Sequence, residues 1–201
     1  NQSVVAAALS LKSNSVSARL SASQPLQSSL LKSLARVQYF GATASDTQKS
    51  VTAEAVGLDF EIDGASDDYA YASNFEDLAM LFEEVMMKFH YDLDREFAFT
   101  DAPEGDDSLC ASYIIRWGVR NRVGLPLVAS RATLALQALL DLNDVDQYNR
   151  SVPDAALMTN FVDWCTIQNL EGVQLAQKPR AASRIAEPTL MRPDVKRRDY
   201  R

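Results

Sequence analysis

The chain has 201 residues, of which 47% are hydrophobic and 23% charged, and its net charge is −7. These values are typical of a folded protein of one domain and exclude wholesale disorder. No run of about 18 apolar residues is present, which excludes a transmembrane helix. One histidine excludes a multi-histidine metal centre. The two cysteines, Cys110 and Cys165, exclude a disulfide framework and a CxxC metal or redox motif.

The first 45 residues form a basic, serine-rich arm, with four basic side chains, eleven serines and no acid. This composition resembles that of organelle transit peptides and favours a plastid or mitochondrial location. A short amphipathic helix is predicted over 25–38, because Leu30, Leu34 and Val37 continue a three- and four-residue apolar spacing. Residues 4–11 are a second, shorter apolar stretch that fits a helix.

Charge is segregated along the rest of the chain as well. Residues 46–107 carry 18 acids against three bases, and residues 108–140 carry four bases and no acid. Residues 178–201 carry eight bases and three acids. Because opposite charges attract, the basic ends of one chain can dock on the acidic body of a neighbour or fold back on their own body.

The region over 46–72 is expected to be an acidic linker or loop, followed by a helical body over 73–171. Ser73 and Glu76 form a capping-box pattern that predicts a helix over 74–90. Further helices are predicted over 108–122, over 127–142 after Pro126, and from Ser151 to about 170. Residues 57–62 and 96–100 fit short strands or extended loops. The expected fold is all-α, an irregular bundle of about four helices with extended N- and C-terminal arms, and residues 172–201 form the basic C-terminal tail.

Two acidic segments are candidates for a metal or catalytic site. Residues 59–67 place carboxylates as in the start of an EF-hand loop, but Ala70 stands where the bidentate glutamate belongs. The second segment, over 101–107, places its carboxylates on a polar turn, where nothing separates their pKa values. Both are interpreted as solvated loops, so no metal, no cofactor and no catalytic residue is expected. His90 is interpreted as a helix-end cation, and both cysteines as core residues.

Four arginines mark the acid-free interior block. Clustered guanidinium groups beside Trp117 fit a phosphate backbone or single-stranded RNA, but salt bridges to the acidic region before them are the favoured interpretation. The residues of this possible nucleic-acid or salt-bridge patch are Arg116, Arg120, Arg122 and Arg131.

The functional hypothesis from the sequence is a non-enzymatic structural or linker subunit of a large multisubunit assembly, which docks on other protein subunits through its basic arms. The expected contact residues are Leu30, Leu34 and Val37 in the N-terminal arm, and Arg192, Lys196, Arg197 and Arg198 in the tail. One alternative is an RNA-binding nucleoprotein or viral coat subunit. The other is an enzyme with an unrecognised carboxylate site, which requires a buried carboxylate of strongly raised pKa beside a pocket.

Overall fold

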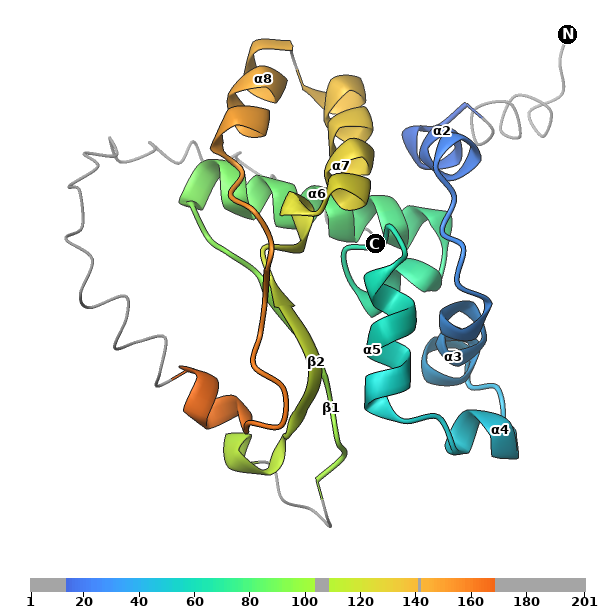
Figure 1. Cartoon of the computed structure of the whole chain (residues 1–201). Helices are drawn as coiled ribbons and strands as arrows, with labels where there is room; N and C mark the ends of the chain where they lie inside the picture. Colours follow the sequence, from blue (N-terminus) through green and yellow to red (C-terminus); the bar gives the residue numbers. More distant parts are fainter. Residues whose placement is uncertain (1–13, 104–108, 141, 169–201) are drawn as a thin grey trace, which may run out of the picture.

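The computed structural model describes residues 14–103, 109–140 and 142–168. In Figure 1, α6 crosses the middle of the molecule, α7 and α8 lie on one side of it, and the β1–β2 hairpin with α5 and α3 lies on the other. The elements are α2 (Val16–Ser23), α3 (Ser29–Phe40), α4 (Asp46–Lys49), α5 (Ala53–Glu61), η1 (Asp68–Tyr71), α6 (Asn74–Tyr91), β1 (Glu96–Thr100), η2 (Cys110–Ser112), β2 (Ile115–Arg120), η3 (Arg122–Gly124), α7 (Pro126–Leu139), α8 (Leu142–Ser151) and β3 (Ala156–Leu157). None of the helices in these ranges is long and apolar enough to cross a membrane.

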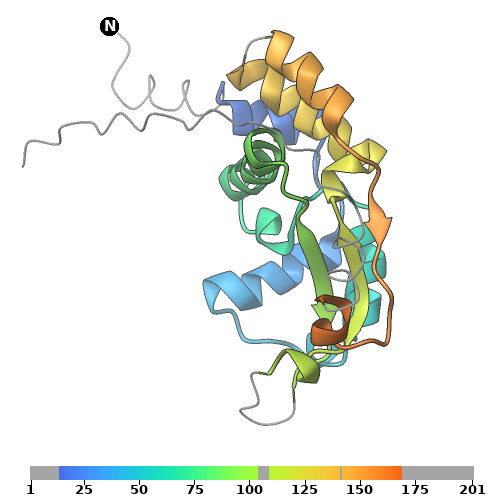
Figure 2. The same ribbon diagram turned by 90° about the vertical axis from the view of Figure 1, so that its left-hand side faces the viewer.

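The fold is mixed α/β, so the prediction of an all-α bundle of about four helices is wrong. A three-stranded antiparallel sheet with the order β1-β2-β3 stands beside the helices. Figure 2 shows β3 on the opposite side of β2 from β1. The strand expected as one option over 96–100 is β1.

The prediction of a helix over 108–122 is wrong, and the error has a physical reason. Trp117 and Val119 pack in the cluster around Phe60, whereas Gly118 between them lies against Met158 on the other face, and this alternation of faces is that of a strand. In a short apolar run this spacing is hard to separate from a helical one. The segment after Ser151 is also extended, since Met158 N donates to the Gly118 carbonyl (2.9 Å) beside β2.

Local sequence signals were sufficient to predict three other helices, α3, α6 and α7. The Ser28 hydroxyl accepts from Leu31 N at the start of α3, and the Ser73 hydroxyl accepts from Glu76 N at the start of α6. Pro126 occupies the first turn of α7, where its missing N–H has no partner to lose. These helices match the predicted ones closely, while α8 was not predicted.

Two main hydrophobic clusters flank the end of α5 and the start of α6. One joins α2, α6, α7 and α8 around Leu81, Val128 and Tyr148. The other joins α3, α5, η1 and β2 around Phe60, whose ring lies 5.0 Å from Phe97 and 5.5 Å from Trp117. Residues 14–40 therefore contribute buried side chains to both clusters.

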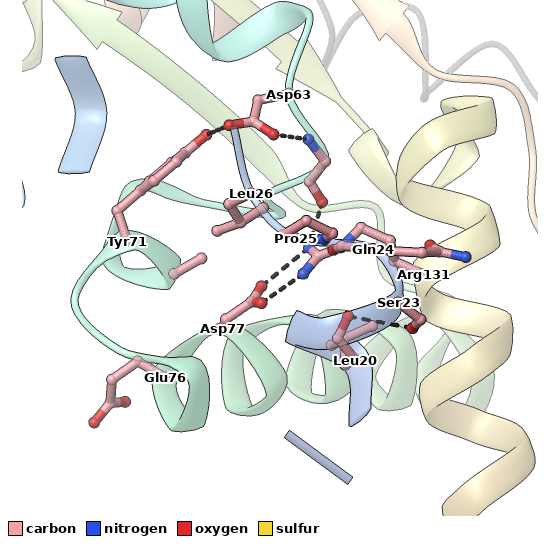
Figure 3. A network of polar contacts seen from close by, with 12 residues as sticks. Leu20, Ser23, Gln24, Pro25, Leu26, Asp63, Tyr71, Glu76, Asp77 and Arg131 are labelled. Atoms are coloured by element: carbon pink, nitrogen blue, oxygen red, sulfur yellow. Dashed lines mark hydrogen bonds and ion pairs between the residues drawn. The ribbon is translucent and has the colours of Figure 1, made fainter. Parts of the chain in front are cut away.

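Between the clusters lies a network of buried charges. Arg131 in α7 donates to both carboxylate oxygens of Asp77 in α6, to the Gly64 carbonyl (2.7 Å) and to the Gln24 carbonyl (3.0 Å). Figure 3 shows how these contacts bring α2, α6 and α7 together. Both side chains are almost fully buried, so each charge depends on the other for compensation.

A second buried arginine organises the end of α5. Arg122 donates to the carbonyls of Phe60, Asp63 and Ala65, and its guanidinium lies 3.8 Å from the centre of the Phe60 ring. These carbonyls lie at and just after the helix C-terminus, where a cation is favoured. Arg122 therefore fixes where α5 stops and where the following loop begins.

Asp63, at the start of that loop, holds α3 in place. Its carboxylate accepts from the amides of Gln27, Ser28 and Gly64 and from the Tyr71 hydroxyl (2.9 Å). Burial opposes ionisation, but the hydrogen bonds from Ser28, Gln27, Gly64 and Tyr71 outweigh it, and the pKa of Asp63 is lowered. The position of α3 thus depends on a charged contact at its N-terminus.

Cys110 and Cys165 form a disulfide with a Cα–Cα distance of 5.1 Å, so their assignment to the core is wrong. The bond links the turn between β1 and β2 to the helical turn at 164–168. Ile167 and Trp164 in that turn pack with Ile115 and Met158, on the face of the sheet away from α5.

We expect Arg131→Met to lower the free energy of unfolding by about 3–5 kcal/mol, because it leaves Asp77 buried without a counter-charge. Denaturant unfolding followed by circular dichroism measures this. Adding Asp77→Asn should recover part of the loss, and Arg150→Met on the surface of α8 should change stability by less than about 0.5 kcal/mol. A loss below about 1 kcal/mol in Arg131→Met would contradict a structural role for the pair.

We also expect the Cys110→Ser, Cys165→Ser double variant to be less stable by about 4 kcal/mol, because the bond closes a loop with a sequence separation of 55. Hydrogen exchange should quicken first in the described residues on either side of the bond, around 112 and 164–168. An exchange pattern unchanged there would show that packing alone holds the segment.

Candidate docking groove

Two of the predicted contact residues line a groove of about 540 Å³ between α3, α5 and the end of β1. We call it the α3–β1 groove. Its lining is Leu31, Leu34, Ala35, Val37, Gln38, Tyr39, Val51, Thr52, Ala53, Val56, Asp68, Phe99, Thr100, Asp101 and Ala102. In Figure 2 the C-terminal part of α3 projects past the edge of β1 that faces away from β2.

That edge of β1 offers free backbone groups. Asn121 N donates to the Arg95 carbonyl (2.8 Å) and Asp101 N donates to the Ile114 carbonyl (3.0 Å), so odd-numbered positions turn their backbone toward β2. Ala98 stands opposite Gly118, whose carbonyl already accepts from Met158, and therefore turns the other way. No described residue pairs with the Ala98 backbone there. An open edge of this kind can accept an extended segment.

The rim of the groove is acidic. Asp68 accepts from the Tyr39 hydroxyl (2.5 Å) and the Gln38 amide (3.2 Å), and among the described residues it has no basic partner. Asp101 is bonded to Arg116 (2.7 Å), and this hydrogen bond lowers its pKa. An apolar floor with carboxylates at the rim suits a segment that carries apolar and basic side chains.

The structure brings only part of the predicted contact set together. Leu34 and Val37 are half-buried and line the α3–β1 groove, while Leu30 is half-buried outside it. The tail residues Arg192, Lys196, Arg197 and Arg198, and the short stretch over 4–11, lie outside the described residues.

The four arginines of the interior block do not form one surface. Arg116 bonds Asp101 and Arg120 bonds Glu96, whereas Arg122 and Arg131 are each only 1% exposed. The block thus binds the acidic region that precedes it in the sequence. Burial leaves Arg122 and Arg131 with no surface to offer to a phosphate.

The acidic segment over 59–67 does not form a loop around a cation. Asp59 lies within α5, Asp63 binds the amides that precede α3, and Asp67 accepts from Arg95 (2.7 Å). No group of three potential metal ligands is found in the part of the chain that the structure describes. Of the second segment, 104–107 lies outside that part, and Asp101 is at the groove rim.

A buried carboxyl group that the sequence did not reveal lies in α6. Glu84 is 3% exposed, and its only hydrogen bond with another described residue is a 3.3 Å contact from Val123 N to Oε1. Burial raises its pKa to about 7, and the positive charge of Arg95 only partly offsets this. Glu84 lies on the same face of α6 as the buried residues Leu81 and Lys88, and this position was the one sequence signal for its burial. The spacing of apolar residues alone does not reveal it.

A larger hollow of about 610 Å³ lies between α2, α3 and the start of α6. Two of its polar groups are already engaged, since Lys32 Nζ donates to the Leu26 carbonyl (2.6 Å) and Asp77 binds Arg131. None of the unpartnered buried polar atoms in the described ranges belongs to its lining. This hollow therefore offers a ligand fewer unpartnered buried polar atoms than the surroundings of Glu84 do.

Comparisons with family models, with curated proteins and with solved structures find no match to this chain. The function of the protein is therefore inferred from the geometry and chemistry of the chain's own residues.

Glu84 makes stability depend on pH in a defined direction. Its ordinary pKa of 4.5 applies to the unfolded chain, and the folded value is about 7. Between these values the unfolded state is ionised while the folded state keeps its proton, so the free energy of unfolding falls as pH rises. The difference corresponds to about 3 kcal/mol.

We therefore expect Glu84→Gln to gain stability relative to the wild type between about pH 4.5 and 7 and to lack this fall in unfolding free energy. Chemical denaturation at a series of pH values checks the difference between the two profiles. Parallel profiles would show that Glu84 titrates as an ordinary carboxyl. Glu83→Gln on the exposed side of α6 is the matched control.

Proposed function

We propose that this protein is a structural subunit of a multisubunit assembly, in which the basic tail of one copy, residues 172–201, binds the α3–β1 groove of the next copy. The observation that carries the proposal is the groove itself. It combines an apolar floor that includes Leu34 and Val37 with the carboxylate of Asp68, which has no basic partner among the described residues. The open edge of β1 at Ala98 lies next to the Phe99 end of the groove.

Charge complementarity supports this occupant. The described residues carry 11 basic and 19 acidic side chains, a net −8, whereas residues 169–201 carry eight bases and four acids, a net +4. The tail also contains apolar residues between its bases, such as Ile185, Leu190 and Met191. Such a segment matches both the floor and the rim of the groove.

The exit of the tail favours a neighbouring copy. The last described residues, 164–168, pack on the face of the sheet opposite to α5, while the groove opens on the α5 side. Figure 1 shows these residues and α3 on opposite sides of the hairpin. A tail that binds its own groove must turn around the sheet edge, whereas a neighbour's tail needs no detour. Head-to-tail contacts of this kind build rings or open chains.

We test the proposal by complementation between two full-length variants. Val37→Asp places a charge on the groove floor, and the Lys196→Glu, Arg197→Glu, Arg198→Glu variant reverses the tail charge. Each variant alone should be monomeric in analytical ultracentrifugation, because one half of the contact is lost. Their mixture should form a 1:1 dimer, since the intact tail of the first fits the intact groove of the second.

Arg150→Asp, on the exposed side of α8, is the control and should assemble as the wild type does. Raising the salt from about 0.05 to 0.5 M should weaken assembly, because exposed charges are screened. A monomeric wild type at about 100 μM would contradict the proposal and is the outcome for a tail bound to its own body. A mixture that stays monomeric would contradict it as well, since the tail and the groove then do not bind each other.

A further inference from the structure

A smaller pocket of about 310 Å³ lies at the end of β1 opposite to the α3–β1 groove, between the C-terminal half of α6 and residues 93–95. Its lining residues are Glu83, Glu84, Met87, Leu93, Asp94 and Arg95. We propose that this pocket binds a primary alkylammonium group, with Glu84 Oε2 as the acceptor at its floor. The proposal does not rest on the docking function.

The floor of the pocket carries unmet hydrogen-bonding capacity. Glu84 Oε2 is buried with no hydrogen-bond partner in the described structure, and the side chain is only 2% exposed. Arg95 Nη1 lies 4.0 Å away, also without a hydrogen bond, because the Nη2 atom of the same guanidinium is held by Asp67 (2.7 Å). Buried polar atoms without partners are uncommon in folded proteins and need an explanation.

The charges around the pocket select a cation. The basic side chains at the pocket are already engaged: Arg95 with Asp67, and Lys88 with Asp92 and Asp94 at 2.7 Å each. Glu83 is exposed and has no basic partner among the described residues. Carboxylates therefore outnumber the cations available to neutralise them, and an entering cation gains more than an anion.

The walls select an alkyl chain. Met87 is 39% exposed and Leu93 is 51% exposed, although both are apolar. A primary ammonium group can donate to Glu84 Oε2 at the floor while its methylene groups cover these two side chains. A quaternary ammonium has no N–H to donate and does not satisfy the floor.

Glu84 must be ionised to accept this cation, so binding is linked to release of its proton. The groups that act on Glu84 are Arg95 after α6, Asp67 before η1, Arg122 in η3 and Tyr148 in α8. Tyr148 and Arg122 each contribute a further buried polar atom without a partner. Affinity should therefore rise as the pH passes about 7, the pKa of Glu84, and then level off.

The test is a titration of the full-length protein with n-butylammonium chloride, followed through the NMR resonance of the Met87 methyl group, with sodium chloride at equal ionic strength as the reference. Near pH 8 we expect a saturable shift with a Kd on the order of 1 mM, within the range available to so small a ligand. Near pH 5.5 the affinity should be at least about tenfold lower, because Glu84 is then mostly protonated.

Glu84→Gln should also weaken binding by at least about tenfold, whereas the matched variant Glu83→Gln at the mouth should weaken it by less than about threefold. Tetramethylammonium should not bind. Binding of n-butanol as tight as that of n-butylammonium would overturn the proposal, since a hydroxyl group could then bridge Glu84 and Arg95. Absence of a saturable shift, or an unchanged affinity in Glu84→Gln, would overturn it as well.

Discussion

The arrangement of the described helices depends on how two buried guanidinium groups hold the loop between α5 and η1. Arg122 binds carbonyls at the end of α5, and Arg131 binds the Gly64 carbonyl and Asp77. With its backbone fixed, the loop presents Asp63 to the amides that begin α3. The direction of α3, and with it one wall of the α3–β1 groove, is therefore set by charges in the interior rather than by apolar contacts alone. Such contacts favour one arrangement because any shift leaves a buried charge unpaired.

The segregation of charge along the sequence has two different consequences in space. The arginines of the interior block bind the acidic region before it: Arg116 to Asp101, Arg120 to Glu96 and Arg131 to Asp77, while Arg122 binds its carbonyls. Their positive charges are therefore compensated by partners within the same chain. Among the described residues, acidic side chains still outnumber basic ones, and in our proposal this excess attracts the basic tail. One compositional pattern thus supports both intramolecular folding and, in our proposal, assembly.

Sequence reasoning found what local chemistry determines. The capping box at Ser73 and the proline at 126 predicted the starts of α6 and α7, and apolar spacing predicted the helix that is α3. Sequence reasoning failed where the structure of a segment is determined by a partner from another part of the chain. β2 is a strand because β1 pairs with it, and Cys165 is bonded to a residue of a distant turn. The buried face of α6 contains Asp77, Glu84 and Lys88, which apolar periodicity assigns to solvent, since their partners come from α7, η3 and the loop after α6. Leu34 and Val37, which line the groove, were predicted as partner contacts of the N-terminal arm, and that role stays a prediction. The strand edge beside them was not predicted.

Comparison of the buried carboxylates with one another singles out Glu84. Asp63 accepts from four donors, three backbone amides and one hydroxyl, and Asp77 is bound by both ends of one guanidinium. Asp67 has Arg95 and the Ala70 amide. Glu84 has one long hydrogen bond, and the nearest charge to its second oxygen is turned toward Asp67. A glutamine at this position would avoid the cost of a buried ionised group. In a fold that satisfies its other buried acids, a carboxylate left open at the floor of a pocket is better explained by a ligand than by stability, because departures from local consistency concentrate at functional sites.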